Sequence, residues 1–147
     1  MKVLVVRVTE GQVVVADESI GSILKGISVF VGIENGDSAE TLATMVEKIV
    51  NLRIFEDDQG KLAYSVKDKG YSILAIPNFT LCASVDKGRR PSFENSMPYE
   101  TAEKLFNDCV LGLKSYAIDV EEGVFGAYMD IKLKLDGPVN IVLDSKR

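Results

Sequence analysis

The sequence predicts an α+β fold in which a barrel-like mixed sheet packs against two amphipathic helices. Two observations lead to this class. Alternating or β-branched segments fill both ends of the chain, and only two segments carry the spacing of a helix. The 147 residues contain no repeat, no linker and no low-complexity stretch. We therefore expect a single domain over residues 1–147.

The first third of the chain predicts three strands. Residues 3–8 alternate in a strand-like manner, a turn is expected at Glu10-Gly11, and Val13-Val14-Val15 form a second strand. The run from Ile27 to Ile33 is apolar on both faces, which is typical of a central strand.

A helix is expected after the sheet breaks at residues 34–37. Asp37, with Glu40 three residues later, resembles a capping box. The residues that follow at helical spacing give an amphipathic helix that ends at about Leu52: Leu42, Met45, Val46, Ile49 and Val50.

The remaining chain predicts a hairpin, a buried strand, a second helix and a β-type tail. The turn at residues 57–60 favours short flanking strands, and the buried strand at residues 71–76 should end at Pro77, which has no amide to donate. A loop over residues 84–98 leads to a helix with Pro98 in its first turn. Its apolar stripe comprises Ala102, Leu105, Phe106, Cys109, Val110, Leu113 and Tyr116. Residues 129–135 and 139–143 read as strands on either side of Asp136-Gly137-Pro138.

Composition removes several classes of chemistry. The chain has 0 His, which excludes Ser-His and Cys-His nucleophile pairs, and its 2 Cys are too few for a cysteine-only zinc site. No glycine-rich phosphate loop and no carboxylate dyad stands out, so we expect no metal and no cofactor. Cys82 and Cys109 are interpreted as small buried hydrophobes.

Net charge and hydropathy limit the cellular location and the partners that we expect for this protein. Net charge is −5, from 17 basic and 22 acidic residues, which argues against a general nucleic-acid binder such as a DNA-binding protein but allows a local basic patch for one RNA end. No run approaches the length of a membrane span, and Arg7 interrupts the amino-terminal apolar stretch too early for a signal peptide. We expect a cytoplasmic protein that does not engage a membrane.

Asp136-Gly137-Pro138 is the most unusual local motif. Asp-Gly between alternating strands normally marks a two-residue hairpin, but Pro138 lacks the amide that would close the turn. Two interpretations stay open: a tolerated open turn, or a Gly-Pro peptide in the cis form that holds its carbonyls toward a ligand.

Two further segments have both a structural and a functional interpretation. Thr80, in Pro77-Asn78-Phe79-Thr80-Leu81, either caps a strand end or serves a site, although no histidine is present to activate it as a nucleophile. Phe79 is either core or a ligand-contacting wall. The loop sequence Lys87-Gly88-Arg89-Arg90 is either a solvated loop or a phosphate-contacting clamp.

Several segments, in order along the whole chain, resemble D-aminoacyl-tRNA deacylases, formerly called D-tyrosyl-tRNA deacylases. The likeness rests on residues 5–8, 51–55, 65–68, 78–81 and 87–93, and on Phe125-Gly126-Ala127 with Met129 and Gly137-Pro138-Val139. The spacing and the total length are also similar to the family's. Their co-occurrence is far more specific than any one motif.

The resemblance implies a homodimeric, barrel-like deacylase domain, without a cofactor, that hydrolyses the ester between a D-amino acid and the 3′-terminal adenosine of tRNA. Glycyl-tRNA is a side substrate in this family. The resemblance places Phe79 and Thr80 at the ester, with Asn78 and Pro77 at the positions of the family's Gln and Ser. Gly137 and Pro138 then form a chirality gate across the dimer interface, where their carbonyls bind the substrate ammonium. Phe125 and Met129 resemble residues near the adenine pocket.

This chain departs from the family pattern at two places. Pro77-Asn78 replaces Ser-Gln, and Asp136 and Asn140 flank Gly137-Pro138-Val139 where the family has Asn and Thr. An achiral-leaning branch of aminoacyl-tRNA deacylases also has Pro at the first position but lacks the Phe that this chain keeps as Phe79. Three alternatives to strict D-selective hydrolysis therefore stay open: that branch, a non-catalytic module that binds a tRNA end, and an interaction protein.

The lack of a histidine is compatible with this chemistry because an aminoacyl ester is already activated. Backbone amides around Phe79 and Thr80 are expected to form an oxyanion hole, which contributes roughly 2.7–4 kcal/mol per donor in comparable sites. The adenosine 2′-hydroxyl is expected to help activate water, with Thr80 positioning or donating a hydrogen bond rather than attacking.

Overall fold

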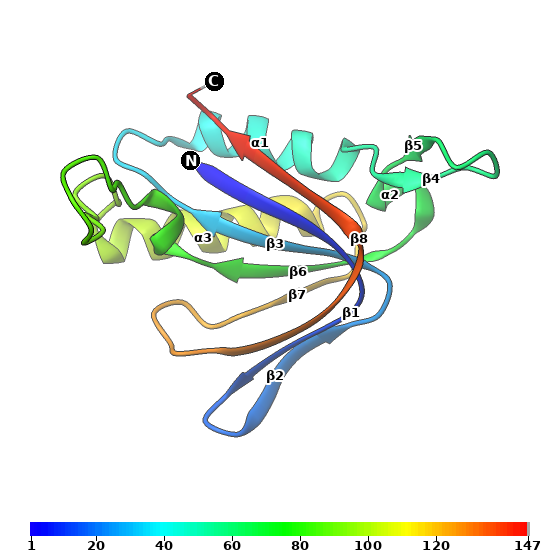
Figure 1. Cartoon of the computed structure of the whole chain (residues 1–147), viewed down its shortest axis with the longest axis horizontal. Helices are drawn as coiled ribbons and strands as arrows, with labels where there is room; N and C mark the ends of the chain where they lie inside the picture. Colours follow the sequence, from blue (N-terminus) through cyan, green and yellow to red (C-terminus); the bar gives the residue numbers. More distant parts are fainter. Residues whose placement is uncertain (147) are drawn as a thin grey trace.

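The computed structural model describes residues 1–146. Its main sheet has the strand order β2-β1-β3-β6-β7, and β8 pairs with β1 as well. In chain order the elements are β1 (Lys2–Val15), β2 (Glu18–Ile23), β3 (Gly26–Gly32), α1 (Ala39–Asn51), β4 (Phe55–Glu56), β5 (Leu62–Tyr64), α2 (Val66–Lys69), β6 (Ser72–Pro77), η1 (Phe79–Cys82), α3 (Tyr99–Lys114), β7 (Val120–Glu122) and β8 (Asp130–Asp144). The expected α+β class and barrel-like mixed sheet are confirmed (Figure 1).

Strand β1 organises the sheet because it pairs with three strands. Its first half pairs with β3, its second half pairs with β2, and β8 runs antiparallel to it along nearly its whole length. The expected turn at Glu10-Gly11 is wrong, since these residues pair with Lys134 and Leu133 of β8. The chain reverses instead at Ala16 and Asp17, whose φ values of 49° and 64° suit a two-residue hairpin loop.

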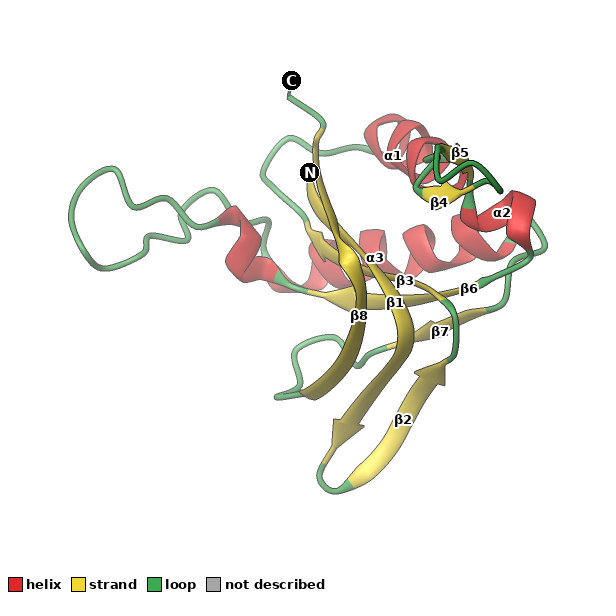
Figure 2. Cartoon of the chain, turned by 45° about the vertical axis from the view of Figure 1, so that its right-hand side comes forward, coloured by secondary structure: helices red, strands yellow, loops and turns green. Residues whose placement is uncertain are grey.

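The two long helices cover one face of the sheet and leave the other uncovered by helices (Figure 2). Their apolar stripes pack into a core that includes Met45, Ile49, Phe106 and Leu113, as the spacing predicted. A smaller cluster, with Val8, Leu74 and Ile76 at its centre, fills the concave opposite face. No helix within residues 1–146 combines the length and apolarity needed to cross a bilayer.

The cap of α1 differs from the expectation at Asp37. Ser38 is the N-cap and accepts from the Thr41 amide, whereas the Asp37 carboxylate accepts from the Glu34 amide at 2.7 Å and from the Met1 ammonium at 2.6 Å. The sequence pattern could not show this, because the Met1 ammonium that engages Asp37 lies 36 residues away in the chain. Pro98 likewise stands one residue before α3, as its N-cap.

The central strands β3 and β6 run parallel, and both end where the chain turns toward α1 and η1. The register pairs Val31 with Pro77, so β6 ends at the proline as expected. The hairpin β4–β5 is also confirmed. The short helix α2 was not predicted because four residues are too few to show a period; its capping box of Ser65 and Asp68 is its only local signal.

Residues 136–138 form a bulge inside a strand, so the expected division of the tail into two strands is wrong. Strand β8 pairs Leu135 with Val8 and Asn140 with Val6, which leaves residues 136–139 opposite the single residue Arg7. The Gly137–Pro138 peptide bond is cis, and both residues are exposed. A Cβ on Gly137, at φ 156°, would collide with the Val139 amide nitrogen, so the bulge requires glycine.

Candidate functional site

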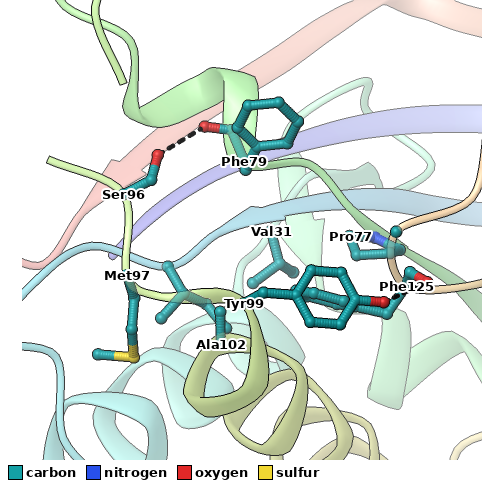
Figure 3. Close-up of a pocket in the computed structure, with 10 residues that line it drawn as sticks. Val31, Pro77, Phe79, Ser96, Met97, Tyr99, Ala102 and Phe125 are labelled. Carbon is teal, nitrogen blue, oxygen red and sulfur yellow. Dashed lines mark hydrogen bonds between the residues drawn. The ribbon is translucent and has the colours of Figure 1, made fainter. Parts of the chain in front are cut away.

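The candidate site lies at the carboxyl ends of the parallel strands β3 and β6. Two cavities of about 350 and 250 Å³ meet there and share Pro77, Phe79 and Gly126. The first, drawn in Figure 3, is lined by Val31, Ile33, Pro77, Phe79, Ser96, Met97, Tyr99, Ala102, Phe125 and Gly126. The second is lined by Phe30, Ile76, Pro77, Asn78, Phe79, Gly126, Ala127, Tyr128, Met129 and Ile131.

The first cavity is an apolar slot with aromatic walls. The rings of Tyr99 and Phe125 meet edge to face at 5.0 Å between centroids, and the Tyr99 hydroxyl donates to the Phe125 carbonyl at 3.4 Å. Ala102, on the first turn of α3, keeps the slot open because its side chain is small. Such a slot suits a planar ring that is read by stacking and by a few polar atoms.

Gly126 lets the segment before β8 approach Tyr99 closely. It has φ +74°, and a Cβ at this position would collide with the Tyr99 ring. Glycine is therefore required both by the backbone conformation and by the contact. The contact keeps Phe125 in the first cavity and leaves Ala127 and Met129 to line the second.

Asn78 and Thr80 form the polar part of the site. The Asn78 side chain caps η1 by accepting from the Thr80 amide at 3.2 Å, and the same oxygen accepts from the Thr80 hydroxyl. The Thr80 amide is therefore engaged within the protein, in contrast to the expected pair of free amides at Phe79 and Thr80. Within residues 1–146 the Phe79 amide has no hydrogen-bond partner, so it is the donor left for a ligand.

Phe79 is a wall of the site rather than a core residue. Its side chain is 58% exposed, and its ring meets Phe93 edge to face at 5.0 Å. The Phe79 carbonyl accepts from the Ser96 hydroxyl at 3.5 Å, as Figure 3 shows. These contacts fix the ring between the two cavities.

The walls of both cavities contain no carboxylate, lysine or arginine. Glu34, which follows Ile33, is buried behind the first cavity. Burial raises its pKa, but a hydrogen bond from Lys146 and the charges of the Met1 ammonium, Lys146 and Lys2 outweigh burial and lower the pKa of Glu34 overall. No cluster of three or more metal-ligand side chains occurs in the described part of the chain.

The two cysteines are buried, as the sequence predicted. Burial raises the pKa of the Cys109 thiol to about 12. Burial and the neighbouring Glu34 charge also raise the pKa of Cys82. A buried thiol that stays protonated is a poor nucleophile.

Most of the predicted site residues come together, but the bulge residues do not join them within one chain. Pro77 lines both cavities, Asn78 and Met129 line the second, Phe125 lines the first, and Thr80 is joined through Asn78. Gly137 and Pro138 line neither cavity. The bulge faces Arg7. Across the sheet, Arg7 of β1 pairs with Ile27 of β3, which pairs in turn with Ile73 of β6. At roughly 3.3 Å per residue, Pro77 lies about 13 Å beyond Ile73 along β6, so the bulge and the cavities are far apart in one chain.

Arg7 is a residue that sequence reasoning missed. It is 6% exposed, and it donates from Nε to the Asp136 carbonyl at 2.9 Å and from Nη1 to the Ile54 carbonyl at 2.7 Å. Glu56 and the Asp136 carboxylate lie 3.5 and 3.4 Å from its guanidinium. The sequence signal that could have identified Arg7 is its position as an arginine in an otherwise apolar strand.

Sequence reasoning also missed four residues that line the cavities, because only the fold brings them to the strand ends. They are Ser96, Tyr99, Ala102 and Tyr128.

Comparison with known proteins gives a consistent result. The family model described as D-Tyr-tRNA(Tyr) deacylase matches residues 4–144. The D-aminoacyl-tRNA deacylase of Halothermothrix orenii is 48% identical over 147 residues, covering 100% of this chain and 99% of the relative. A solved structure described as a c-Myc DNA unwinding element binding protein is 43% identical, with a TM-score of 0.92 and 98% of each chain covered. Another, described as a probable eukaryotic D-amino acid tRNA deacylase, shares the fold at 18% identity, with a TM-score of 0.82 and 97% of each chain covered. The chain therefore belongs to the D-Tyr-tRNA(Tyr) deacylase family.

Proposed function

We propose that this protein hydrolyses the ester bond of D-aminoacyl-tRNA and releases the free D-amino acid and tRNA. Family membership over nearly the whole chain supports a deacylase that acts on aminoacyl-tRNA. The single observation that carries the proposal is the position of Phe79, which stands between an apolar slot and a second cavity that both open at the end of β6. An aminoacylated terminal nucleotide has the same two parts, a flat base and an amino acid, joined through a ribose ester.

The terminal adenine occupies the first cavity in this proposal. Tyr99 and Phe125 supply faces and edges for stacking, and the carbonyls and hydroxyls at the rim supply hydrogen bonds. The amino acid then occupies the second cavity, and the ester lies between them beside Phe79 and Asn78.

The Phe79 amide is the proposed oxyanion donor. A single such donor contributes roughly 2.7–4 kcal/mol to transition-state stabilisation in comparable sites. The adenosine 2′-hydroxyl relays a proton in place of a protein base: it accepts a proton from the attacking water as it passes its own proton to the departing 3′-oxygen. It can do so because the contacts that bind the adenine hold it beside the ester.

Thr80 positions Asn78 rather than attacking the ester. Its hydroxyl proton is donated to the Asn78 carboxamide oxygen, which is not a base that can take the proton away. A threonine nucleophile requires such a base. The two side chains together fix the backbone of η1, and thus the direction of the Phe79 amide.

The bulge at Gly137 and Pro138 completes the site of a second copy in a homodimer. The two residues are exposed on β8, and they stand at the end of the strands opposite to Phe79. A two-fold arrangement lets each copy present its bulge to the other's cavities. Exposed Leu135 and Val142 on the same strand supply apolar area for this interface. The bulge carbonyls accept the substrate ammonium, and backbone at this position leaves no room for an L side chain.

Selectivity for D-amino acids and acceptance of glycine follow from the same gate. A glycyl group has no side chain to collide with the backbone, so glycyl-tRNA passes as a side substrate. Incubation of the protein with D-tyrosyl-tRNA, L-tyrosyl-tRNA and glycyl-tRNA tests the proposal directly. Rapid release of D-tyrosine and glycine, with L-tyrosyl-tRNA intact, is the expected result.

The other outcomes assign the alternative functions. Hydrolysis of glycyl-tRNA without D-over-L preference indicates the achiral-leaning branch, to which Pro77 also points. Protection of all three esters indicates a binding module. A full-length dimer that neither binds nor cleaves them contradicts the proposal altogether.

A further inference from the structure

The loop between η1 and α3 carries a concentrated positive charge that the proposed site does not use. Lys87, Arg89 and Arg90 fall within four residues of a chain whose net charge is −5. All three are exposed, and none of them forms an ion pair with a carboxylate of residues 1–146. Figure 2 shows this loop extending from η1, away from the sheet.

The base of the loop is attached firmly to the candidate site. Ser84 and Ser92 exchange backbone hydrogen bonds of 2.9 and 2.8 Å, which close the loop. The next residue, Phe93, packs its ring against Phe79, and the Asn35 amide donates to the Asn95 carbonyl at 2.8 Å. The base of the loop is therefore anchored beside Phe79, and the cations project from it.

The loop encloses a polar cavity of its own. It measures about 200 Å³ and is lined by Ser84, Lys87, Arg90, Ser92, Glu94 and Asn95. Two cations, two hydroxyls and an amide thus face one small space, with Glu94 as the single opposing charge in its wall. Asp86, also in the loop, accepts from the Ser84 hydroxyl at 2.7 Å, which leaves Lys87, Arg90, Ser92 and Asn95 as the donors to this cavity. A singly charged anion with several acceptor oxygens fits this set of donors.

We propose that Lys87 and Arg90 bind a phosphodiester of the RNA strand that leads to the terminal nucleotide. The inference rests on the proposed function, which places that nucleotide at Phe79. A strand that leaves the cavities at Phe79 passes the loop, because Phe93 joins the two. Such phosphate contacts set the register of the strand and carry no information about the bases. Arg89 adds long-range electrostatic attraction for the RNA strand.

The test compares Lys87→Gln/Arg90→Gln with a matched control, Lys25→Gln/Lys48→Gln, which removes the same charge from exposed sites away from the loop. The first measurement is the affinity for uncharged tRNA at 50 to 200 mM salt. For two contacts to a single strand, the slope of log affinity against log salt falls by about 1.4. Wild-type and control proteins then lose about sevenfold more affinity over this range than the loop variant.

The second measurement is kcat/KM on D-tyrosyl-tRNA and on D-tyrosyl-adenosine, which has the ester but no phosphodiester. The loop variant is expected to lose activity on the tRNA and to keep wild-type activity on the nucleoside ester. Equal losses on both substrates overturn the proposal, as does an unchanged salt slope. If the loop variant no longer forms a dimer, the proposal is also overturned, because the loop cations then contact a second copy of the chain instead of RNA.

The two proposals fail in different ways. If the wild-type protein cleaves neither ester, the proposed function is wrong, and the tRNA affinities still decide whether the loop binds RNA. If wild type cleaves both esters and the loop variant matches it in every measurement, only the loop proposal is wrong.

Discussion

Arg7 and Asp136 are joined by a hydrogen bond from the buried guanidinium to the backbone carbonyl that immediately precedes Gly137. The same guanidinium donates to the Ile54 carbonyl, so one side chain ties the β8 bulge to the segment before β4. Because Arg7 lies opposite the bulge in the β1–β8 pair, it fixes the position of the exposed residues Gly137 and Pro138.

Replacing Arg7 with alanine should lower the free energy of unfolding by roughly 2–4 kcal/mol, since two carbonyls lose a charged donor at a buried position. Urea denaturation measures the loss. Arg53→Ala removes an exposed arginine and should stay within about 0.5 kcal/mol of wild type. A near-wild-type stability of the Arg7 variant would show that water replaces the guanidinium.

Replacing Thr80 with valine should lower kcat on D-tyrosyl-tRNA by less than about tenfold, the equivalent of 1.4 kcal/mol. The variant keeps the shape of the side chain and loses only the hydroxyl that positions Asn78. Single-turnover hydrolysis measures the change, and Thr80→Ser, which retains the hydroxyl, is the control. Isolation of an acyl-enzyme on Thr80 would refute the positioning role.

Replacing Ala102 with phenylalanine should fill the first cavity and raise KM for D-tyrosyl-tRNA by at least about tenfold. Ala102 is nearly buried in the slot wall, so the larger ring competes with the base and costs about 1–3 kcal/mol of stability. Leu111→Phe makes a similar enlargement on α3 at a position that is 64% exposed, and it should leave KM unchanged. Steady-state kinetics on folded variants separate the two. Unchanged KM in the Ala102 variant would place the adenine elsewhere.

Glu34 should make the protein sensitive to acid. Its pKa is lowered in the folded protein, so in acid the unfolded chain binds more protons than the folded one, and the stabilisation is lost as pH falls. The loss begins below about pH 4.3, the ordinary value for Glu, and continues to the lower folded pKa. Urea denaturation between pH 6 and pH 3 should show a shallower pH dependence for Glu34→Gln than for wild type. An identical dependence would mean that other carboxylates cause the acid sensitivity.

Local patterns in the sequence predicted the parts of the fold that depend on neighbouring residues. The stripes of α1 and α3, the buried strand before Pro77 and the β4–β5 hairpin all carry a period or a turn that can be read within about fifteen residues. The turn expected at Glu10-Gly11 failed because pairing with β8, more than 120 residues away in the chain, overrides the local preference of Glu-Gly.

The candidate site was predicted only in part, because local sequence patterns do not show which distant residues the fold brings together. Phe79 and Thr80 were singled out by their place after a buried strand, and the resemblance assigned them to the ester; Met129 was reached through the resemblance alone. Tyr99 and Ala102 belong to a helix whose sequence shows only an amphipathic stripe, and nothing local marks the two residues that face β6. The engagement of the Thr80 amide by Asn78 is likewise a matter of side-chain geometry.

The separation between the β8 bulge and the cavities has a genetic consequence under the proposed dimer. Each catalytic centre draws its gate from one polypeptide and its cleft from the other. A copy altered at Pro138 and a copy altered at Ala102 are then both impaired alone, yet co-expressed they assemble mixed pairs in which one of the two centres is fully wild type. Two defective alleles would complement each other, with at most half of the normal activity in each mixed pair.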